Sequence, residues 1–127
     1  MSEVLNLKSI SQFFYQGKNK INVLKNLDLV LYSSQKTAII GSSGSGKTSL
    51  LNIISLMEKP KEGSIFLLGK SVAETSDNDK SDLRKANIGY VHQKNSLLME
   101  FTAFENIYLS LLLNNYNKKY AKEKTMH

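Results

Sequence analysis

Eight residues at positions 41 to 48 constrain this chain more than any other part of its sequence. They read Gly-Ser-Ser-Gly-Ser-Gly-Lys-Thr and match the pattern G-x-x-x-x-G-K-[ST] at every fixed position. Glycines in such a segment let the backbone wrap around phosphate oxygens, because they permit dihedral angles and close approaches that a Cβ would block. The sequence therefore predicts a phosphate-binding loop made of Gly41, Ser42, Ser43, Gly44, Ser45, Gly46, Lys47 and Thr48.

The flanking sequence favours this interpretation over a flexible glycine-serine linker. The short apolar run Thr37–Ile40 precedes the loop and predicts a buried strand. Apolar residues at helical spacing follow it and predict a helix over 47–57, with Pro60 stopping that helix. The expected ligands are ATP and Mg²⁺: the N-terminal end of the helix would face the anion, Lys47 would reach the β- and γ-phosphates, and the Thr48 hydroxyl would bind the metal.

The other segments complete an α/β pattern. Alternating apolar residues predict strands at 5–7, 27–31 and 64–68, and a short apolar run predicts another at 88–91. Residues 71–82 predict a loop with at most a short helix. Residues 101–113 predict a helix with Thr102 as N-cap and Glu105 at the third helical position, and 114–127 are expected to fray.

Composition excludes several classes of function. The chain has no cysteine, so it can have neither a disulfide framework nor a thiolate metal site. The net charge is +6, but Arg84 is the only arginine and no aromatic-interleaved basic patch occurs, so a nucleic-acid partner is not expected. The longest apolar stretch, 107–113, is interrupted by Ser110 and is far too short to cross a membrane.

A second element distinguishes among the classes of phosphate-loop protein. The sequence Ile88-Gly89-Tyr90-Val91-His92-Gln93, taken with Ser-Gly-Ser-Gly-Lys-Thr, resembles the strand and glutamine loop of the ABC ATPase family. The resemblance implies that Lys47 and Gln93 are the catalytic residues. It also implies that Gln93 contacts Mg²⁺ and the attacking water and senses a transmembrane partner. The family fold is α/β, with a mostly parallel core sheet, an antiparallel β layer and a helical subdomain.

The aromatic cluster at 13–15 lies where the family carries the side chain that stacks on adenine. Ungapped spacing to Gly41 selects Phe14, with Tyr15 as the alternative. An aromatic face suits a purine ring, although packing in the core is an equally good role for either residue.

The segment 97–106 resembles the start of the family's helical subdomain, and it is most similar to the lipoprotein-releasing (LolD-like) and macrolide-exporter-like group. Residues 67–70 and 83–84 also fit that group. The resemblance implies an ATP-binding subunit that is cytoplasmic and peripheral on the inner face of the cytoplasmic membrane. It would work with a transmembrane permease subunit and a second ATP-binding subunit, and ATP hydrolysis would drive export or release of a substrate, expected to be a lipoprotein.

The chain departs from the family pattern in several places. Residues 33–35 read Ser-Ser-Gln where a Gly-Glu pair is usual, and His92 replaces a common aromatic. The family's Leu-Ser-Gly-Gly-Gln signature, Asp-Glu pair and switch histidine do not occur before His127. Residues 1–127 are therefore expected to be the N-terminal part of one nucleotide-binding domain, ending inside the helical subdomain and inactive in hydrolysis on their own. The alternatives are a soluble ABC ATPase without a membrane partner, a phosphate-loop enzyme of another family, and a non-hydrolytic fragment.

Overall fold

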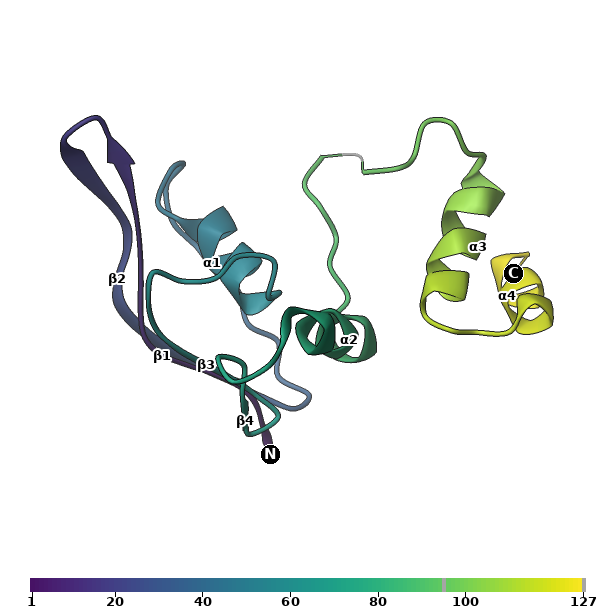
Figure 1. Cartoon of the computed structure of the whole chain (residues 1–127), viewed down its shortest axis with the longest axis horizontal. Helices are drawn as coiled ribbons and strands as arrows, with labels where there is room; N and C mark the ends of the chain where they lie inside the picture. Colours follow the sequence, from purple (N-terminus) through teal and green to yellow (C-terminus); the bar gives the residue numbers. More distant parts are fainter. Residues whose placement is uncertain (95, 127) are drawn as a thin grey trace. The chain divides into compact units, whose positions relative to one another are not determined.

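A computed structural model of the chain describes residues 1–94 and 96–126. The chain forms two compact units, Met1–Arg84 and Lys85–His127. Four strands and helix α1 belong to the first unit, and helices α3 and α4 belong to the second (Figure 1).

The first unit is built on an antiparallel sheet with the strand order β2-β1-β3-β4. The strands are β1 (Glu3–Gln16), β2 (Asn19–Tyr32), β3 (Glu62–Leu67) and β4 (Lys70–Ser71). β1 and β2 form a long hairpin that turns at residues 17–18, where Gln16 pairs with Asn19. The three strands predicted at 5–7, 27–31 and 64–68 are thus confirmed as an antiparallel layer, and the first two are longer than predicted.

One face of this sheet packs against helix α1 (Lys47–Ile54). Leu7 and Ile10 of β1 and Ile53 of α1 are completely buried. Burying a Leu or Ile side chain contributes about 1.5–3 kcal/mol, so these three side chains are a large part of what stabilises the first unit. β3 approaches β1 so closely that a Cβ on Gly63 would lie 2.5 Å from the Lys8 carbonyl oxygen, and its φ of +96° also requires glycine.

Gln12 is the polar member of this core. Its side chain is buried, its Nε2 donates to Glu58 Oε1, and its Oε1 accepts from the backbone N–H of Lys61 at 3.0 Å. Both ends of the amide are therefore satisfied, as a buried polar group requires. These bonds fasten the segment that follows α1 to the centre of β1.

Two predicted strands do not form. Residues 37–40 and 88–91 have no strand structure, and Ile40 is 92% exposed. A strand exists only through hydrogen bonds to a neighbouring strand, and no described segment pairs with either run. Among the described residues these two runs therefore form no parallel core sheet. The antiparallel layer and the helices confirm the predicted α/β class.

Three helical predictions need correction. α1 ends at Ile54 rather than at residue 57, because the chain turns at Leu56 with a φ of +58°. Helix α2 (Asp77–Asn87) replaces the predicted loop, and Ser76 supports its start by accepting from the Asp79 backbone N–H at 3.2 Å. Helix α4 (Lys118–Thr125) forms where fraying was expected, because Asn117 caps its first turn.

Helix α3 (Ala103–Leu113) confirms the predicted helix and its cap. The Thr102 hydroxyl accepts from the Glu105 backbone N–H at 3.2 Å, and the Glu105 carboxylate accepts from the Thr102 N–H at 2.8 Å. The backbone bond from Thr102, followed by that from its hydroxyl, holds the pKa of Glu105 below its ordinary value. None of the described helices combines the length and apolar content that a membrane span needs.

Candidate nucleotide-binding site

The glycine-rich loop runs directly into α1, and Gly46 is the residue at the junction. Gly46 is the N-cap of the helix, with a φ of +89° in the left-handed region. A Cβ at this position would lie 2.9 Å from the Val23 carbonyl oxygen and 3.1 Å from Leu24 Cδ2. Only glycine satisfies both the dihedral angle and this close packing against β2. Strand β2 therefore forms the wall that sets the position of the loop.

The N-terminal end of α1 has the properties of an anion site. The first intrahelical hydrogen bond runs from the Leu50 N–H to the Gly46 carbonyl at 2.8 Å. N–H groups before this point have no intrahelical partner, and no side chain caps them. The first turn also carries no acidic residue. The positive end of the helix dipole is consequently available to a negatively charged ligand.

Lys47 curls back over the loop. Its Nζ donates to the carbonyl oxygens of Gly41 at 2.8 Å and Ser42 at 2.5 Å, and to Ser45 Oγ at 3.3 Å. The loop is thus folded around a positive charge, and that charge sits on the first residue of the helix. Phosphate oxygens can compete for the same ammonium because charge-assisted bonds to an anion are stronger than bonds to neutral carbonyls.

Thr48 and Gln93 are the predicted metal ligands. Thr48 is exposed, and its hydroxyl makes no hydrogen bond among the residues that the structure describes. Mg²⁺ commonly takes few protein ligands and completes its shell with water and substrate phosphates, so one hydroxyl beside a phosphate loop fits this metal. Within 1–94 and 96–126 no group of three or more His, Cys, Asp or Glu side chains could hold a metal. Gln93 is exposed and belongs to the second unit, so its role stays a prediction.

Strand β1 separates the two aromatic candidates. Gln12 pairs with Leu24 and Phe14 pairs with Ile21, but the register shifts between Gln12 and Phe13. The face of Phe14 is therefore set by its neighbours in the strand: Phe13 and Tyr15 contact each other on one face, so Phe14 lies on the other. Tyr15 lies on the opposite face, where its ring contacts Phe13 with the centroids 5.9 Å apart.

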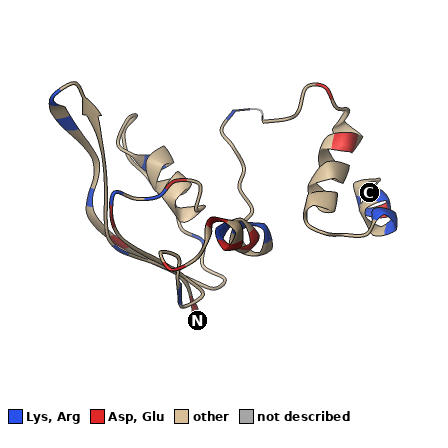
Figure 2. Cartoon of the chain, viewed as in Figure 1, with Lys and Arg blue, Asp and Glu red and all other residues tan. Residues whose placement is uncertain are grey.

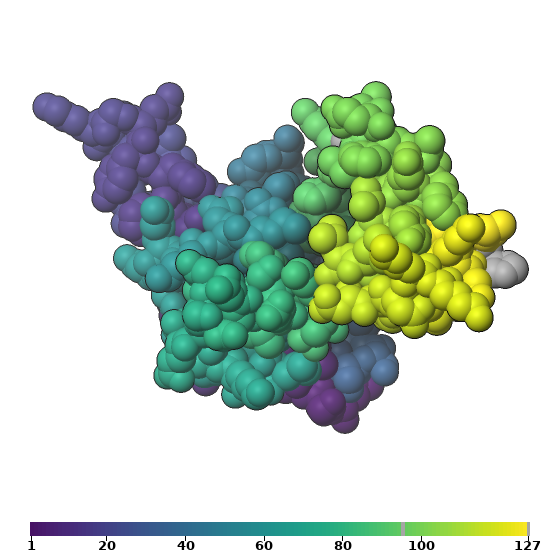
Figure 3. All heavy atoms as spheres, turned by 45° about the vertical axis from the view of Figure 1, so that its right-hand side comes forward, coloured from purple at the N-terminus to yellow at the C-terminus, as the bar shows by residue number. Residues whose placement is uncertain are grey.

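The outer face of the hairpin is organised differently. Lys20 places its Nζ 3.7 Å above the Phe13 ring, which ties this face together through a cation–π contact. Phe14 takes no part in that cluster and is 48% exposed. Figure 3 shows the hairpin end of the first unit, in purple, standing out beyond α1. The core-packing alternative for Phe14 therefore loses support, since half of its surface is free.

In the second unit, Asn106 fixes the segment that precedes α3. Its Oδ1 accepts from the Leu98 N–H at 2.8 Å, and its Nδ2 lies within hydrogen-bonding distance of the Leu98, Phe101 and Thr102 carbonyls at 3.1, 3.2 and 3.0 Å. The segment it holds is nevertheless apolar and exposed, with Met99 86% accessible. Sequence reasoning missed this role, although an asparagine in the first turn of a helix after an apolar loop was a usable signal.

Comparison with known proteins decides the family. A profile of the ABC transporter family matches residues 24–127. The chain belongs to this family. Among curated ABC proteins it is 42% identical over 123 residues to the lipoprotein-releasing system ATP-binding protein LolD of Hahella chejuensis, covering 97% of this chain. It is 37% identical over 119 residues to LolD of Wigglesworthia glossinidia brevipalpis, covering 94% of this chain.

Solved ABC structures agree with this membership. The ATP-binding cassette MJ0796, in a dimeric post-hydrolysis state bound to ADP and phosphate, superimposes with a TM-score of 0.89 at 29% identity. The match covers 96% of this chain and 54% of that one. The chain likewise spans about half the length of its curated relatives, with 53% of the Hahella chejuensis protein covered. The predicted ABC family is confirmed, and the similarity to proteins named LolD agrees with the predicted resemblance to the lipoprotein-releasing and macrolide-exporter-like group.

Proposed function

We propose that the chain supplies the ATP-binding part of an ABC transporter of the lipoprotein-releasing type. The observation that carries the proposal is the arrangement at residues 41–48. A complete phosphate-loop sequence leads into a helix whose N-terminal N–H groups are uncapped, with the Lys47 ammonium held in the loop. The relatives named for lipoprotein release supply the substrate class.

Each part of the loop has a distinct task in this proposal. The backbone N–H groups at the start of α1 bind phosphate oxygens, and Lys47 exchanges its carbonyl contacts for the β- and γ-phosphates. Thr48 and Gln93 would hold Mg²⁺, which when bound neutralises charge on the phosphates. Gln93 would also orient the attacking water. Phosphoryl transfer depends on such positioning and charge stabilisation rather than on covalent chemistry by the protein.

Phe14 is the proposed adenine platform. It lies on the face of the hairpin opposite to Tyr15, and its ring is half exposed. Phe14→Ala is expected to raise the ATP dissociation constant by about 5- to 150-fold, on the scale of roughly 1–3 kcal/mol per stacked base. Fluorescence titration with ATP measures this.

Tyr15→Ala is the matched control for this test, because it removes an aromatic ring from the opposite face. Tyr15→Ala should change the ATP dissociation constant by no more than about twofold and lower the stability of the chain only slightly, as surface substitutions do. A large affinity loss for Tyr15→Ala with none for Phe14→Ala would reverse the assignment.

The partner surface is the apolar segment that Asn106 holds. Six exposed apolar side chains lie along it and the adjoining turns of α3, namely Leu97, Leu98, Met99, Phe101, Phe104 and Ile107. Only one charged residue, Glu105, occurs in α3 itself, whereas α4 is lysine-rich (Figure 2). An ordered, exposed apolar patch is typical of an interaction site. We assign it to the transmembrane permease subunit, which would keep the chain on the inner face of the cytoplasmic membrane and paired with a second ATP-binding subunit.

A crosslinking experiment tests the whole proposal. A photocrosslinker at position 99, introduced into the complete transporter in native membranes, is expected to capture the permease subunit. Asn106→Ala should reduce the yield several-fold while leaving ATP affinity unchanged, because it frees the segment without touching the loop. The same probe at position 18, at the hairpin turn, is the control and should not capture the permease. Capture of ribosomal or DNA-associated proteins instead would show a soluble ABC ATPase.

A further inference from the structure

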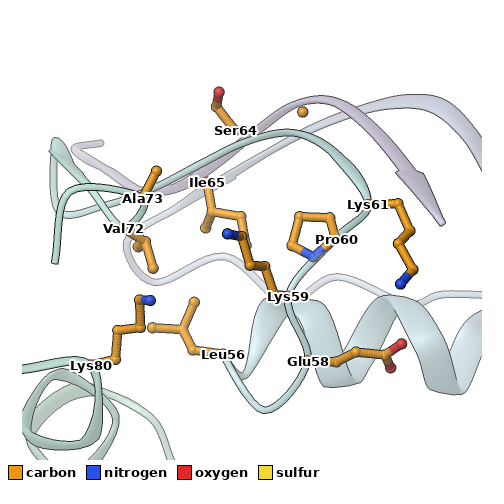
Figure 4. A pocket seen from close by; sticks show the side chains of 11 residues that line it. Leu56, Glu58, Lys59, Pro60, Lys61, Ser64, Ile65, Val72, Ala73 and Lys80 are labelled. Carbon is orange, nitrogen blue, oxygen red and sulfur yellow. The ribbon is translucent and has the colours of Figure 1, made fainter. Parts of the chain in front are cut away.

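A hollow of about 150 Å³ lies in the first unit, away from the phosphate loop (Figure 4). It opens at the end of α1 opposite to Gly46, between the segment that follows α1 and strand β3. Its walls are mostly apolar and come from Leu56, Pro60, Ile65, Val72 and Ala73. Leu56, Ile65 and Val72 are also members of the core, so the floor of the hollow is rigid.

Two lysine side chains reach over these apolar walls. In Figure 4 the side chains of Lys59 and Lys80 both point toward the apolar walls, Lys80 toward Val72. Lys59 has no hydrogen-bond or ion-pair partner within the described residues. The Lys80 side chain is only 25% exposed, and its Nζ forms an ion pair with Asp77 Oδ1 at 3.2 Å. The Asp77 side chain itself is 99% exposed.

Glu58 is the only carboxylate in the lining, and its Oε1 accepts from the buried Gln12 amide. Figure 4 shows the carboxylate of Glu58 and the amine of Lys61 directed away from the apolar walls. The Lys80 ammonium is paired with Asp77, so the Lys59 ammonium is the charge at the opening that has no partner among the described residues. The opening therefore combines an unpaired ammonium with an apolar floor.

From this combination we infer that the hollow binds a small organic anion whose apolar body is about the size of one six-membered ring. The size follows from the volume, since an apolar cavity of about 150 Å³ accommodates a molecule as large as benzene. The charge follows from the lysines, because a carboxylate can bond to an ammonium while its ring replaces water on the apolar walls. The site is separate from the phosphate loop and does not depend on the proposed transport function.

Three probe molecules of one shape test the inference: benzoate, benzyl alcohol and benzylammonium. Titrated into the full chain and followed by methyl and amide NMR, benzoate is expected to shift the signals of Ile65, Val72 and Ala73. Its dissociation constant should be at least about tenfold lower than that of the alcohol, as expected for a charge-assisted bond. The ammonium compound should not bind at these residues.

Variants test whether benzoate binding depends on Lys59 and Lys80 or on the positive surface charge in general. The double variant Lys59→Gln with Lys80→Gln should lower benzoate affinity by about tenfold or more, to that of the alcohol. Lys70→Gln, on the exposed strand β4 outside the lining, is the matched control and should change nothing. Ala73→Trp should block benzoate binding by filling the hollow. A circular dichroism spectrum checks that this variant is folded. If the variant does not fold, the affinity of the double lysine variant is the test. Equal binding of benzylammonium, unchanged affinity in the double variant, or shifts confined to residues 41–48 would each overturn the inference.

Discussion

Replacement of Lys47 by alanine is expected to weaken ATP binding by about 10- to 150-fold, which corresponds to roughly 1.5–3 kcal/mol for hydrogen bonds to a charged group. The side chain supplies the cation within the loop, and its three contacts at Gly41, Ser42 and Ser45 are solvent-exposed. Their loss should leave the fold intact. Calorimetric titration of the chain measures the affinity, and phosphate release by the complete subunit should fall to the uncatalysed rate.

Lys25→Ala is the control for this substitution, because Lys25 is an exposed lysine of β2. It removes the same charge from the first unit but none from the loop. The affinity of the Lys25→Ala variant for ATP should stay within about twofold of that of the unsubstituted chain, since an exposed charge at a distance is screened by salt. Equal losses in both variants would mean that binding depends on net charge rather than on the loop.

Gly46→Ala is expected to destabilise the first unit by about 2–5 kcal/mol and to abolish nucleotide binding. About 1–2 kcal/mol comes from placing a Cβ in the left-handed region, and about 1–3 kcal/mol from overpacking. The overpacking arises because the new Cβ would lie 2.9 Å from the Val23 carbonyl oxygen. Relief of that contact requires the start of α1 to move away from β2, and the phosphate-binding N–H groups move with it.

Gly44→Ala measures the cost of a Cβ in the left-handed region without the cost of overpacking. Gly44 also has a positive φ, +77°, but a Cβ there would meet nothing within 4 Å. Its cost should therefore be only the conformational part, about 1–2 kcal/mol. Denaturant unfolding of both variants gives the comparison. If the two substitutions cost the same, β2 does not position the loop.

Local sequence signals predicted the elements whose structure is local. The glycine pattern at 41–48 was followed by a helix, and Thr102 with Glu105 formed the predicted capping box. Ser76 with Asp79, and Asn117 before a run of good helix formers, were equally local signals for the starts of α2 and α4. The same rule would have predicted α4, and it would have given α2 its observed start where only a loop with a short helix was expected.

Features that depend on distant partners could not be obtained in this way. The run Thr37–Ile40 is apolar and β-branched, but strand structure needs a neighbour that hydrogen-bonds to it, and periodicity says nothing about that neighbour. The faces on which Phe14 and Tyr15 lie could be assigned only from the strand and the contact between the Phe13 and Tyr15 rings, because adjacent residues of a strand lie on opposite faces. The wall that Val23 forms behind Gly46 is likewise a contact between segments far apart in sequence.

The N-terminal end of α1 is proposed to bind the phosphates of a nucleotide, and amide NMR of the chain during titration with ATP and Mg²⁺, repeated with AMP, tests this. We expect large shifts for the backbone N–H groups of Gly46, Lys47 and Thr48 with ATP, and far smaller ones with AMP, which lacks the β- and γ-phosphates. Shifts of equal size with both nucleotides, or no change at these three residues, would contradict it.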